Sequence, residues 1–230
     1  GLLPNYAFPE EGVTLRSVRL RKEEIWAKEY RRPASQALKE LAPGATFYAG
    51  GRKVQVDQID LSGEDALQEW RLCDQCGHLE QVVEETGRAV ACPHCGSPQW
   101  ADAGQQHTLV SHQEVTATTL DRKSRITDDT EDRAPMFYDT RLHVGIDKRD
   151  VDMAYRIKDG EIPFGFEFAR NAELHEINFG EIGPNDRLKY AGEPVHGKGF
   201  DTCPQCGRVD IDDDEDGINH TQSCTTQTQH

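Results

Sequence analysis

Seven cysteines carry the most specific chemistry in this sequence. Four of them form two C-x2-C pairs, Cys73 with Cys76 and Cys92 with Cys95, and fifteen residues separate the two pairs. Two such pairs joined by a hairpin-length insert can place four thiolates at the corners of a tetrahedron, the geometry that Zn²⁺ prefers. Residues 72–101 therefore predict a zinc ribbon.

The insert between the two pairs has the pattern of a β-hairpin. We expect a strand over residues 79–83, a turn at 85–87 and a returning strand over 88–91. A glycine follows each pair, Gly77 and Gly96, and lets the backbone turn tightly around the sulfur atoms.

The remaining three cysteines predict a second metal site. Cys203, Cys206, His220 and Cys224 follow the spacing C-x2-C-x13-H-x3-C, which supplies four ligands in a finger-like or treble-clef arrangement. The eight ligands complete two tetrahedral sites, so we predict two structural Zn²⁺ ions. Two alternatives stay open, namely a reduced pair with incidental neighbours and a crossed arrangement that mixes the two clusters.

Neither predicted site has the pattern of a catalytic zinc. Both are rich in thiolate and have four ligands, whereas a catalytic zinc keeps one position open for water or substrate. The sequence contains no H-E-x-x-H motif, and no C-x2-C pair is preceded by Pro as the deaminase pattern H-x-E…P-C-x2-C requires. Because every cysteine is assigned to metal, no Cys–His nucleophile remains. We predict that this chain is not an enzyme.

Charge is distributed unevenly along the 230 residues, which carry a formal net charge of −15. Residues 1–53 hold ten Lys and Arg against six Asp and Glu, whereas the rest holds sixteen against thirty-five. A basic face in the first segment could contact nucleic-acid phosphates. An ordinary solvated strand face is the alternative. The candidate phosphate-binding residues are Arg16, Arg19, Arg21, Lys22, Arg31, Arg32, Arg52 and Lys53, with Lys28 beside them.

Short strands dominate the expected secondary structure. Residues 13–20 alternate apolar and basic side chains, which predicts a strand with one wet, basic face. Residues 24–32 continue as an extended or short helical run, and 33–44 are the clearest helix. A tight hairpin should follow over 46–59, and β patterns return over 100–119 and 137–179.

The expected fold class is α+β and strand-rich, built of small lobes with a zinc ribbon and a second zinc site. Apolar residues make up only 36% of the chain, so small lobes would have small hydrophobic cores and would need bound metal ions to stabilise them. We divide the chain into a basic lobe, a ribbon, a β-rich lobe with a charged loop at 121–135, and a second zinc cluster. Their ranges are 1–71, 72–101, 102–200 and 201–230.

No apolar run reaches 18 residues, so no membrane span is expected. Paired cysteines without a closed disulfide framework indicate a reducing compartment, which predicts a cytoplasmic location. The chain begins without Met, and we expect it to be a piece of a larger polypeptide.

The order of several motifs resembles one known family. The motifs are LLPNYAFPEEGVTLRSV, RPASQALKELAPGATFYAGGRKVQVDQIDL, the two C-x2-C pairs with SPQWADAG, DRKSRITDDTEDR and CPQCGRV…HTQSC. In that order they resemble the cysteine-rich C-terminal region of large superfamily 2 DEAD/DEAH-box helicases, long catalogued as a domain of unknown function. Members of that family occur in anti-phage defence systems such as Druantia and DISARM, and related ones act in DNA repair.

The resemblance implies a zinc-stabilised accessory module that helps a helicase motor hold DNA or a partner subunit. It also implies a helicase core in the same polypeptide, with ATPase activity belonging to that core. This chain itself carries no Walker A motif and no DEAD/DEAH box. A protein-interaction scaffold, which docks the motor onto a partner subunit, is the alternative function.

Overall fold

The computed structural model describes residues 12–21, 24–63, 65–83, 89–120, 136–157, 165–182, 188–190, 193–195, 199–211 and 220–225. Strands dominate these residues, with one α-helix and three short 3-10 helices among them. The predicted strand-rich character is therefore confirmed. The charged loop at 121–135 and the turn predicted at 85–87 lie outside the described residues.

The described strands are β1 Gly12–Arg21, β2 Glu24–Pro33, β3 Thr46–Ala49, β4 Arg52–Gln55, β5 Gln58–Ile59, β6 Leu67–Leu72, β7 Leu79–Gln81, β8 Gln106–Val110, β9 Glu114–Leu120, β10 Tyr138–Gly145, β11 Val151–Arg156, β12 Gly165–Ala169, β13 Glu173–Glu181, β14 Leu188–Tyr190 and β15 Glu193–Val195. The helices are α1 Ala34–Glu40, η1 Pro98–Ala101, η2 Ala103–Gln105 and η3 Lys148–Asp150.

The chain folds into two compact units, each made of separate stretches of sequence. Unit 1 comprises residues 1–67, 110–140 and 178–230, and unit 2 comprises 68–109 and 141–177. The last thirty residues thus belong to the same unit as the first lobe. The division into four consecutive segments stays a prediction.

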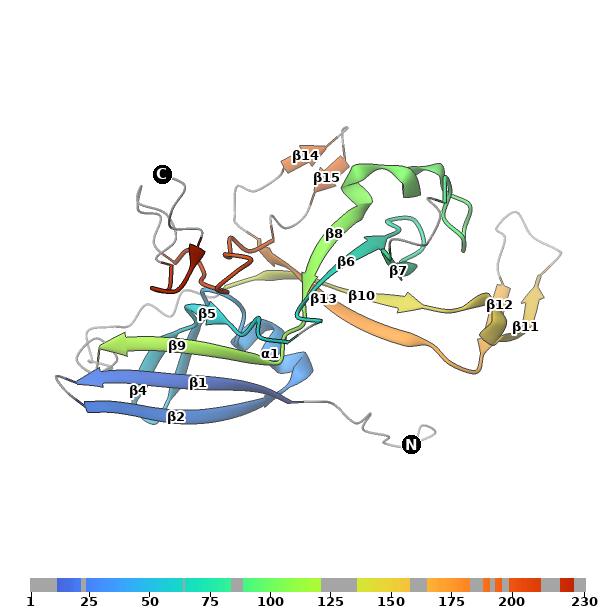
Figure 1. Ribbon diagram of the computed structural model, residues 1–230. Coiled ribbons are helices and arrows are strands. Elements are labelled where there is room, and N and C mark those ends of the chain that lie inside the picture. Colours follow the sequence, from blue (N-terminus) through green and yellow to red (C-terminus); the bar gives the residue numbers. More distant parts are fainter. Residues whose placement is uncertain are drawn as a thin grey trace, which may run out of the picture. The chain divides into compact units, whose positions relative to one another are not determined.

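Unit 1 is built on a four-stranded sheet in the order β2-β1-β9-β5. β1 pairs antiparallel with β2 and parallel with β9, and β5 closes the other edge antiparallel to β9. Figure 1 shows these strands side by side, with α1 behind the sheet. The buried core on this face comprises Val13, Leu15, Ala37, Leu41, Phe47, Val54, Val56, Ile59, Val115, Ala117 and Val209.

The strand predicted over residues 13–20 is confirmed, but its basic residues do not share one face. Its pairing with β2 runs without a bulge from Gly12 to Arg21, so side chains alternate strictly between the two faces. Val13 and Leu15 point into the core, whereas Leu20, five positions after Leu15, is exposed. Because successive side chains of an unbroken strand point to opposite faces throughout, the arginines are divided between the two faces of the sheet.

The predicted helix and hairpin are both present, with shorter bounds for the helix. α1 covers Ala34–Glu40, because Pro33 ends β2 and serves as the residue before the helix. Strands β3 and β4 form the predicted tight hairpin, but its second strand ends at Gln55 rather than Ile59. Residues 58–59 form β5, which pairs with β9 in the four-stranded sheet instead. Gly50 and Gly51 at the turn of the hairpin have φ of 57° and 69°, and this left-handed pair matches the twist of two-residue hairpins.

Unit 2 contains the three-stranded sheet β7-β6-β8 and the separate hairpin β11–β12. β7 pairs antiparallel with β6, with Leu72 opposite Leu79. The returning strand expected over residues 88–91 is wrong for the part that the structure describes, since 89–91 have no strand structure. The reason is that β7 finds its partner in β6, ahead of the first cysteine pair. Two further strand pairs are β10 with β13 and, within unit 1, β14 with β15.

The alternation along β1 can be tested with two substitutions of one residue type. Leu15→Ala removes a fully buried side chain and should lower the free energy of unfolding by about 3 kcal/mol. Leu20→Ala lies on the exposed face and should cost less than about 1 kcal/mol. Urea unfolding of both variants gives the comparison, and equal losses would contradict the assignment of faces.

Candidate metal centres

The three C-x2-C pairs fold into the same backbone knuckle. In each, the amide of the first cysteine donates to the carbonyl five residues later, and the amide of the following glycine donates to the carbonyl of the first cysteine. These hydrogen bonds are Cys73 N to His78 O, Cys92 N to Ser97 O and Cys203 N to Arg208 O, all 2.8 Å, and Gly77 N to Cys73 O, Gly96 N to Cys92 O and Gly207 N to Cys203 O, at 2.9, 2.8 and 2.9 Å.

The glycine of each knuckle has a left-handed backbone, with φ of 71°, 78° and 67° at Gly77, Gly96 and Gly207. Glycine is favoured in this region because it has no Cβ. Gly207 has a second constraint, since a Cβ there would lie 1.9 Å from the carbonyl oxygen of Ile59. The third knuckle therefore approaches strand β5 more closely than any side chain would allow.

The first two knuckles bring their four sulfur atoms together in unit 2. Cys73 Sγ lies 3.7 Å from Cys95 Sγ, and Cys76 Sγ lies 3.7 Å from Cys92 Sγ. All four sulfurs lie within 4.8 Å of one another. A disulfide needs about 2.05 Å between sulfurs, so these cysteines are not bonded to each other.

The third knuckle forms a second cluster in unit 1 with two residues that follow it. Cys203 Sγ lies 3.7 Å from Cys224 Sγ, and His220 Nδ1 lies 3.6 Å from Cys206 Sγ and 3.5 Å from Cys224 Sγ. These four atoms also lie within 4.8 Å of one another. The structure thus groups the eight candidate ligands in the two uncrossed sets.

The distances fit a tetrahedral metal ion in each cluster. Bonds of about 2.3 Å to sulfur place two sulfurs about 3.8 Å apart, and a bond of about 2.0 Å to nitrogen reduces that edge to about 3.5 Å. The observed edges of 3.7 Å between sulfurs and 3.5–3.6 Å between sulfur and nitrogen match both values. Two cysteine-rich clusters that suit two metal ions are therefore present.

Burial and backbone amides act in opposite directions on the thiols. Burial raises the pKa of Cys73 and Cys76, so their ionised forms need a positive partner. A hydrogen bond from the Ser97 amide lowers the pKa of Cys95. Burial also opposes ionisation of Cys206, but amide and side-chain hydrogen bonds outweigh it, so that its pKa falls to about 7.

A short helical segment covers the first cluster. Trp100, in η1, is buried and packs against Cys73 and Cys92. The Arg71 guanidinium donates to the Trp100 carbonyl at 2.6 Å and lies 5.9 Å from the indole ring. The buried Gln105 side chain accepts from the Asp74 amide and donates to the Asp74 carboxylate, which fixes the loop of the first knuckle. In the sequence, this segment was identified only as part of the family resemblance. Its tryptophan, close to the second cysteine pair, could have indicated that the segment covers the cluster.

The second cluster is attached to the sheet of unit 1 at β5. Gln58 Nε2 donates to the Cys206 carbonyl at 2.8 Å, and the Ile59 amide donates to the Gly207 carbonyl at 2.8 Å. Arg208 forms an ion pair with Asp57, whose other carboxylate oxygen accepts from the Thr118 amide at 3.1 Å. Burial outweighs these contacts and raises the pKa of Asp57. No sequence pattern indicates this attachment, because the partners lie about 150 residues apart.

The candidate nucleic-acid residues fall on different faces of unit 1. Arg16 and Arg31 belong to the outward face, because Arg16 lies opposite Glu29 and Arg31 opposite Thr14. Arg19 shares the core-facing side. Arg32, on that same side, is engaged by Glu40 at 2.9 Å and lies over the Phe47 ring. Arg52 and Lys53 begin β4, and the side chain of Arg21 and all of Lys22 lie outside the described residues.

No protein-family model matches the chain, and neither a curated protein nor a solved structure matches it. Among the described residues, no helix combines the length and the apolar character that a bilayer span requires.

Metal content tests both clusters. Mass spectrometry of the purified native chain should find two metal ions, and Cys76→Ser or Cys206→Ser should each remove one. Structural metal is worth on the order of 10 kcal/mol at neutral pH, so each variant should also unfold its own cluster. Ser223→Ala, an exposed neighbour of Cys224, should keep both ions. One ion or none in the unaltered chain would contradict the two-site arrangement.

Proposed function

We propose that this chain is a non-catalytic, zinc-stabilised accessory domain of a DEAD/DEAH-box helicase and contributes to its engagement of DNA. The observation that carries the proposal is the concentration of Lys and Arg on the strand pair β1–β2 of a chain whose net charge is −15. A local basic surface on an acidic molecule favours phosphate contact at one place and repels nucleic acid elsewhere.

Zinc is the metal that this proposal assigns to both clusters. Four thiolates, or three thiolates with one imidazole, leave no open coordination position, which is the arrangement of structural zinc. The first cluster would then be the zinc ribbon and the second the treble-clef-like site. Elemental analysis of the native chain should find zinc, and iron in either cluster would contradict the assignment.

The helicase assignment rests on the sequence resemblance. Within it, the helicase core of the same polypeptide is the ATPase, the whole acts on DNA in the cytoplasm, and its setting is anti-phage defence or DNA repair. The outward arginines of β1–β2 supply the phosphate contacts. Arg16 is exposed, and so is Arg31.

Salt-dependent DNA binding tests this proposal. Fluorescence anisotropy with labelled single- and double-stranded oligonucleotides should detect binding to the native chain at low salt. Affinity should fall steeply as salt rises, and the double variant Arg16→Glu/Arg31→Glu should reduce the logarithmic slope by about 1 to 2, since each lost phosphate contact removes about 0.9 on duplex DNA.

The control is the double variant Lys39→Glu/Arg156→Glu, which changes the net charge by the same amount. Both positions are exposed and lie outside the strand pair β1–β2, so this variant should retain the salt slope. The proposal fails if the native chain does not bind either oligonucleotide at low salt, or if its affinity is indifferent to salt.

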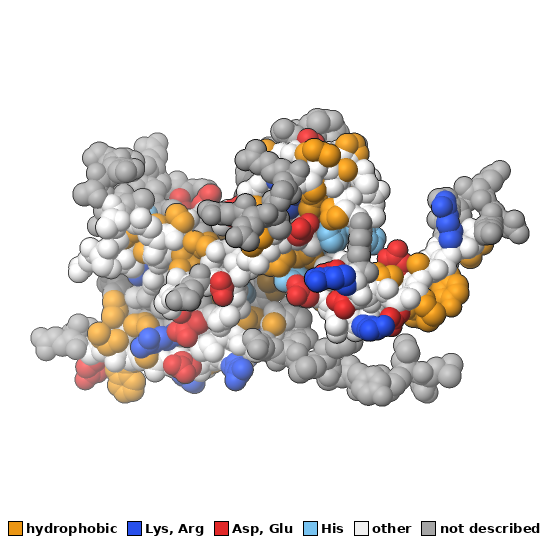
Figure 2. Space-filling view, turned by 45° about the vertical axis from the view of Figure 1, so that its right-hand side comes forward, with side chains coloured by type: hydrophobic (Ala, Val, Ile, Leu, Met, Phe, Trp, Pro, Cys, Tyr) orange, Lys and Arg blue, Asp and Glu red, His pale blue; other side chains and the backbone are white. Residues whose placement is uncertain are grey.

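A second candidate function, the docking of the motor onto a partner subunit, is favoured by the hairpin β11–β12. Met153 lies opposite Phe168 and Tyr155 opposite Phe166, so these four side chains share one face. Each is between 52% and 58% exposed. Figure 2 shows this surface as an orange patch on the hairpin at the right of the view. A two-stranded hairpin with a bare apolar face is only marginally stable alone, so a protein partner would stabilise it.

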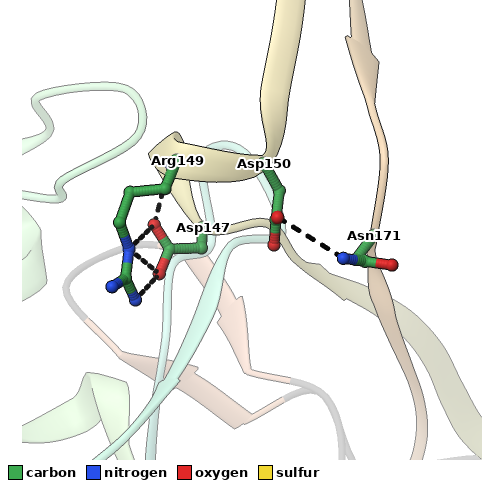
Figure 3. A network of polar contacts seen from close by, with 4 residues as sticks. All are labelled: Asp147, Arg149, Asp150 and Asn171. Carbon is green, nitrogen blue, oxygen red and sulfur yellow. Dashed lines mark hydrogen bonds and ion pairs between the residues drawn. The ribbon is translucent and has the colours of Figure 1, made fainter.

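The base of this hairpin is braced, as the polar network in Figure 3 shows. Arg149 donates to both carboxylate oxygens of Asp147, and these hydrogen bonds lower the pKa of Asp147 to about 2. Asn171 donates to Asp150 at 3.4 Å, and the Arg170 amide donates to the Asp150 carbonyl at 2.8 Å. The contacts of Asp150 link the start of β11 to the residues that follow β12.

Site-specific cross-linking tests the docking function. A photoreactive phenylalanine analogue in place of Tyr155 should cross-link to one defined subunit when the chain is expressed within its parent polypeptide. The same analogue at Glu167, on the opposite face of the hairpin, should not. Equal cross-linking from both positions, or none from either, would contradict a role for this face.

A further inference from the structure

Unit 1 contains a small pocket at the end of its sheet that the function above does not use. It has a volume of about 70 Å³. The pocket lies between the strand pair β1–β2 and the tip of the hairpin β3–β4. Its lining residues are Ser17, Arg19, Lys28, Tyr30, Ala49, Gly50, Arg52 and Val54.

The strand register explains why polar groups gather here. Leu15 and Tyr30 are paired across β1 and β2, and Ser17 and Lys28 are the next pair on the same face. Tyr30 packs against Phe47 at 5.4 Å between ring centroids, so it marks the edge of the apolar core. Beyond it, the core-facing side of the sheet continues with Lys28 and Arg19, which line the pocket together with Gly50 at the hairpin tip.

Three cationic side chains line the pocket. Arg19, Lys28 and Arg52 contribute three positive charges, and none of the described residues that line the pocket is acidic. Lys28 Nζ lies 4.9 Å from the centroid of the Tyr30 ring, which favours a defined position for the ammonium group. Ser17 and Tyr30 add hydroxyl groups that can donate hydrogen bonds, and the Tyr30 oxygen lies beside Gly50.

We propose that this pocket binds one phosphate group. Guanidinium, ammonium and hydroxyl donors around one small space match the charge and the several acceptor oxygens of a phosphate. The pocket volume is far below the roughly 300–1,000 Å³ of pockets that hold drug-sized ligands, which suits a single small anion and not a nucleotide. Resting on the proposed function, we assign this group to the backbone of a bound DNA strand. A free phosphate ion is the other source of the same chemistry.

The pocket and the outward face can be separated by matched substitutions on one strand. Arg19→Gln removes a lining residue, whereas Arg16→Gln, three positions earlier on the opposite face, leaves the pocket intact. Lys28→Gln and Lys53→Gln form a second such pair, since only Lys28 lines the pocket. Circular dichroism and thermal unfolding of all four variants establish that each is folded.

The first measurement uses inorganic phosphate as the probe. Phosphate added to the native, metal-loaded chain at constant ionic strength should shift the amide resonances of Arg19, Lys28 and Gly50. Chloride at the same ionic strength should not. The phosphate concentration that gives half of the shift should rise about tenfold for Arg19→Gln and Lys28→Gln. It should stay the same for Arg16→Gln and Lys53→Gln.

The second measurement uses the labelled oligonucleotides and distinguishes the two sources of phosphate. Binding of DNA in the pocket predicts about tenfold weaker affinity for Arg19→Gln and a salt slope smaller by about 1. Phosphate shifts with no DNA binding by the native chain would support a free-phosphate pocket and overturn both the DNA assignment and the proposed function.

The results that would refute the phosphate pocket differ from those that would refute the proposed DNA-binding function. Salt-dependent DNA binding that is unchanged in Arg19→Gln and Lys28→Gln, with no phosphate shifts at the pocket amides, would overturn the pocket and leave the proposed function standing.

Discussion

This structure depends on how the negative charge of its clustered cysteine thiolates is balanced. Burial raises the pKa of the Cys73 and Cys76 thiols, yet four sulfurs converge in one cluster and three with an imidazole in the other. A metal ion in each cluster would resolve that conflict, because it would stabilise thiolates that otherwise repel one another. With only 36% apolar residues, the chain has few other means of holding such short strands.

The clusters also organise what surrounds them. In unit 2, Trp100 and the 3-10 segments cover the sulfurs and hold the knuckle loops through Arg71 and Gln105. In unit 1, the third knuckle extends the central sheet, since the close approach of Gly207 to Ile59 lets Val209 reach the core. The cysteine-rich cluster of residues 203–224 thereby supports a sheet formed near the beginning of the chain.

Strand geometry distributes the chemistry of the surface. The alternation of β1 and β2 puts Arg16 and Arg31 on the outer face and Arg19 and Lys28 on the inner one, so one basic sequence yields two separate cationic surfaces. The same alternation in β11–β12 collects aromatic and apolar side chains on a single face. Net charge alone would have concealed both features, because the chain as a whole is acidic.

Local patterns were enough to predict the two candidate ligand sets, the strand-rich character, the β3–β4 hairpin and the position of α1. Each of these depends on short-range spacing and turn chemistry: a C-x2-C-G knuckle closes its own hydrogen bonds within six residues, and Gly50-Gly51 makes its own turn. The partner of β7, the attachment of Arg208 to Asp57 and the face on which each arginine lies came from the folded chain alone. Those features depend on pairing between distant segments, where a shift of one residue exchanges the two faces of a strand and no local pattern records which register wins.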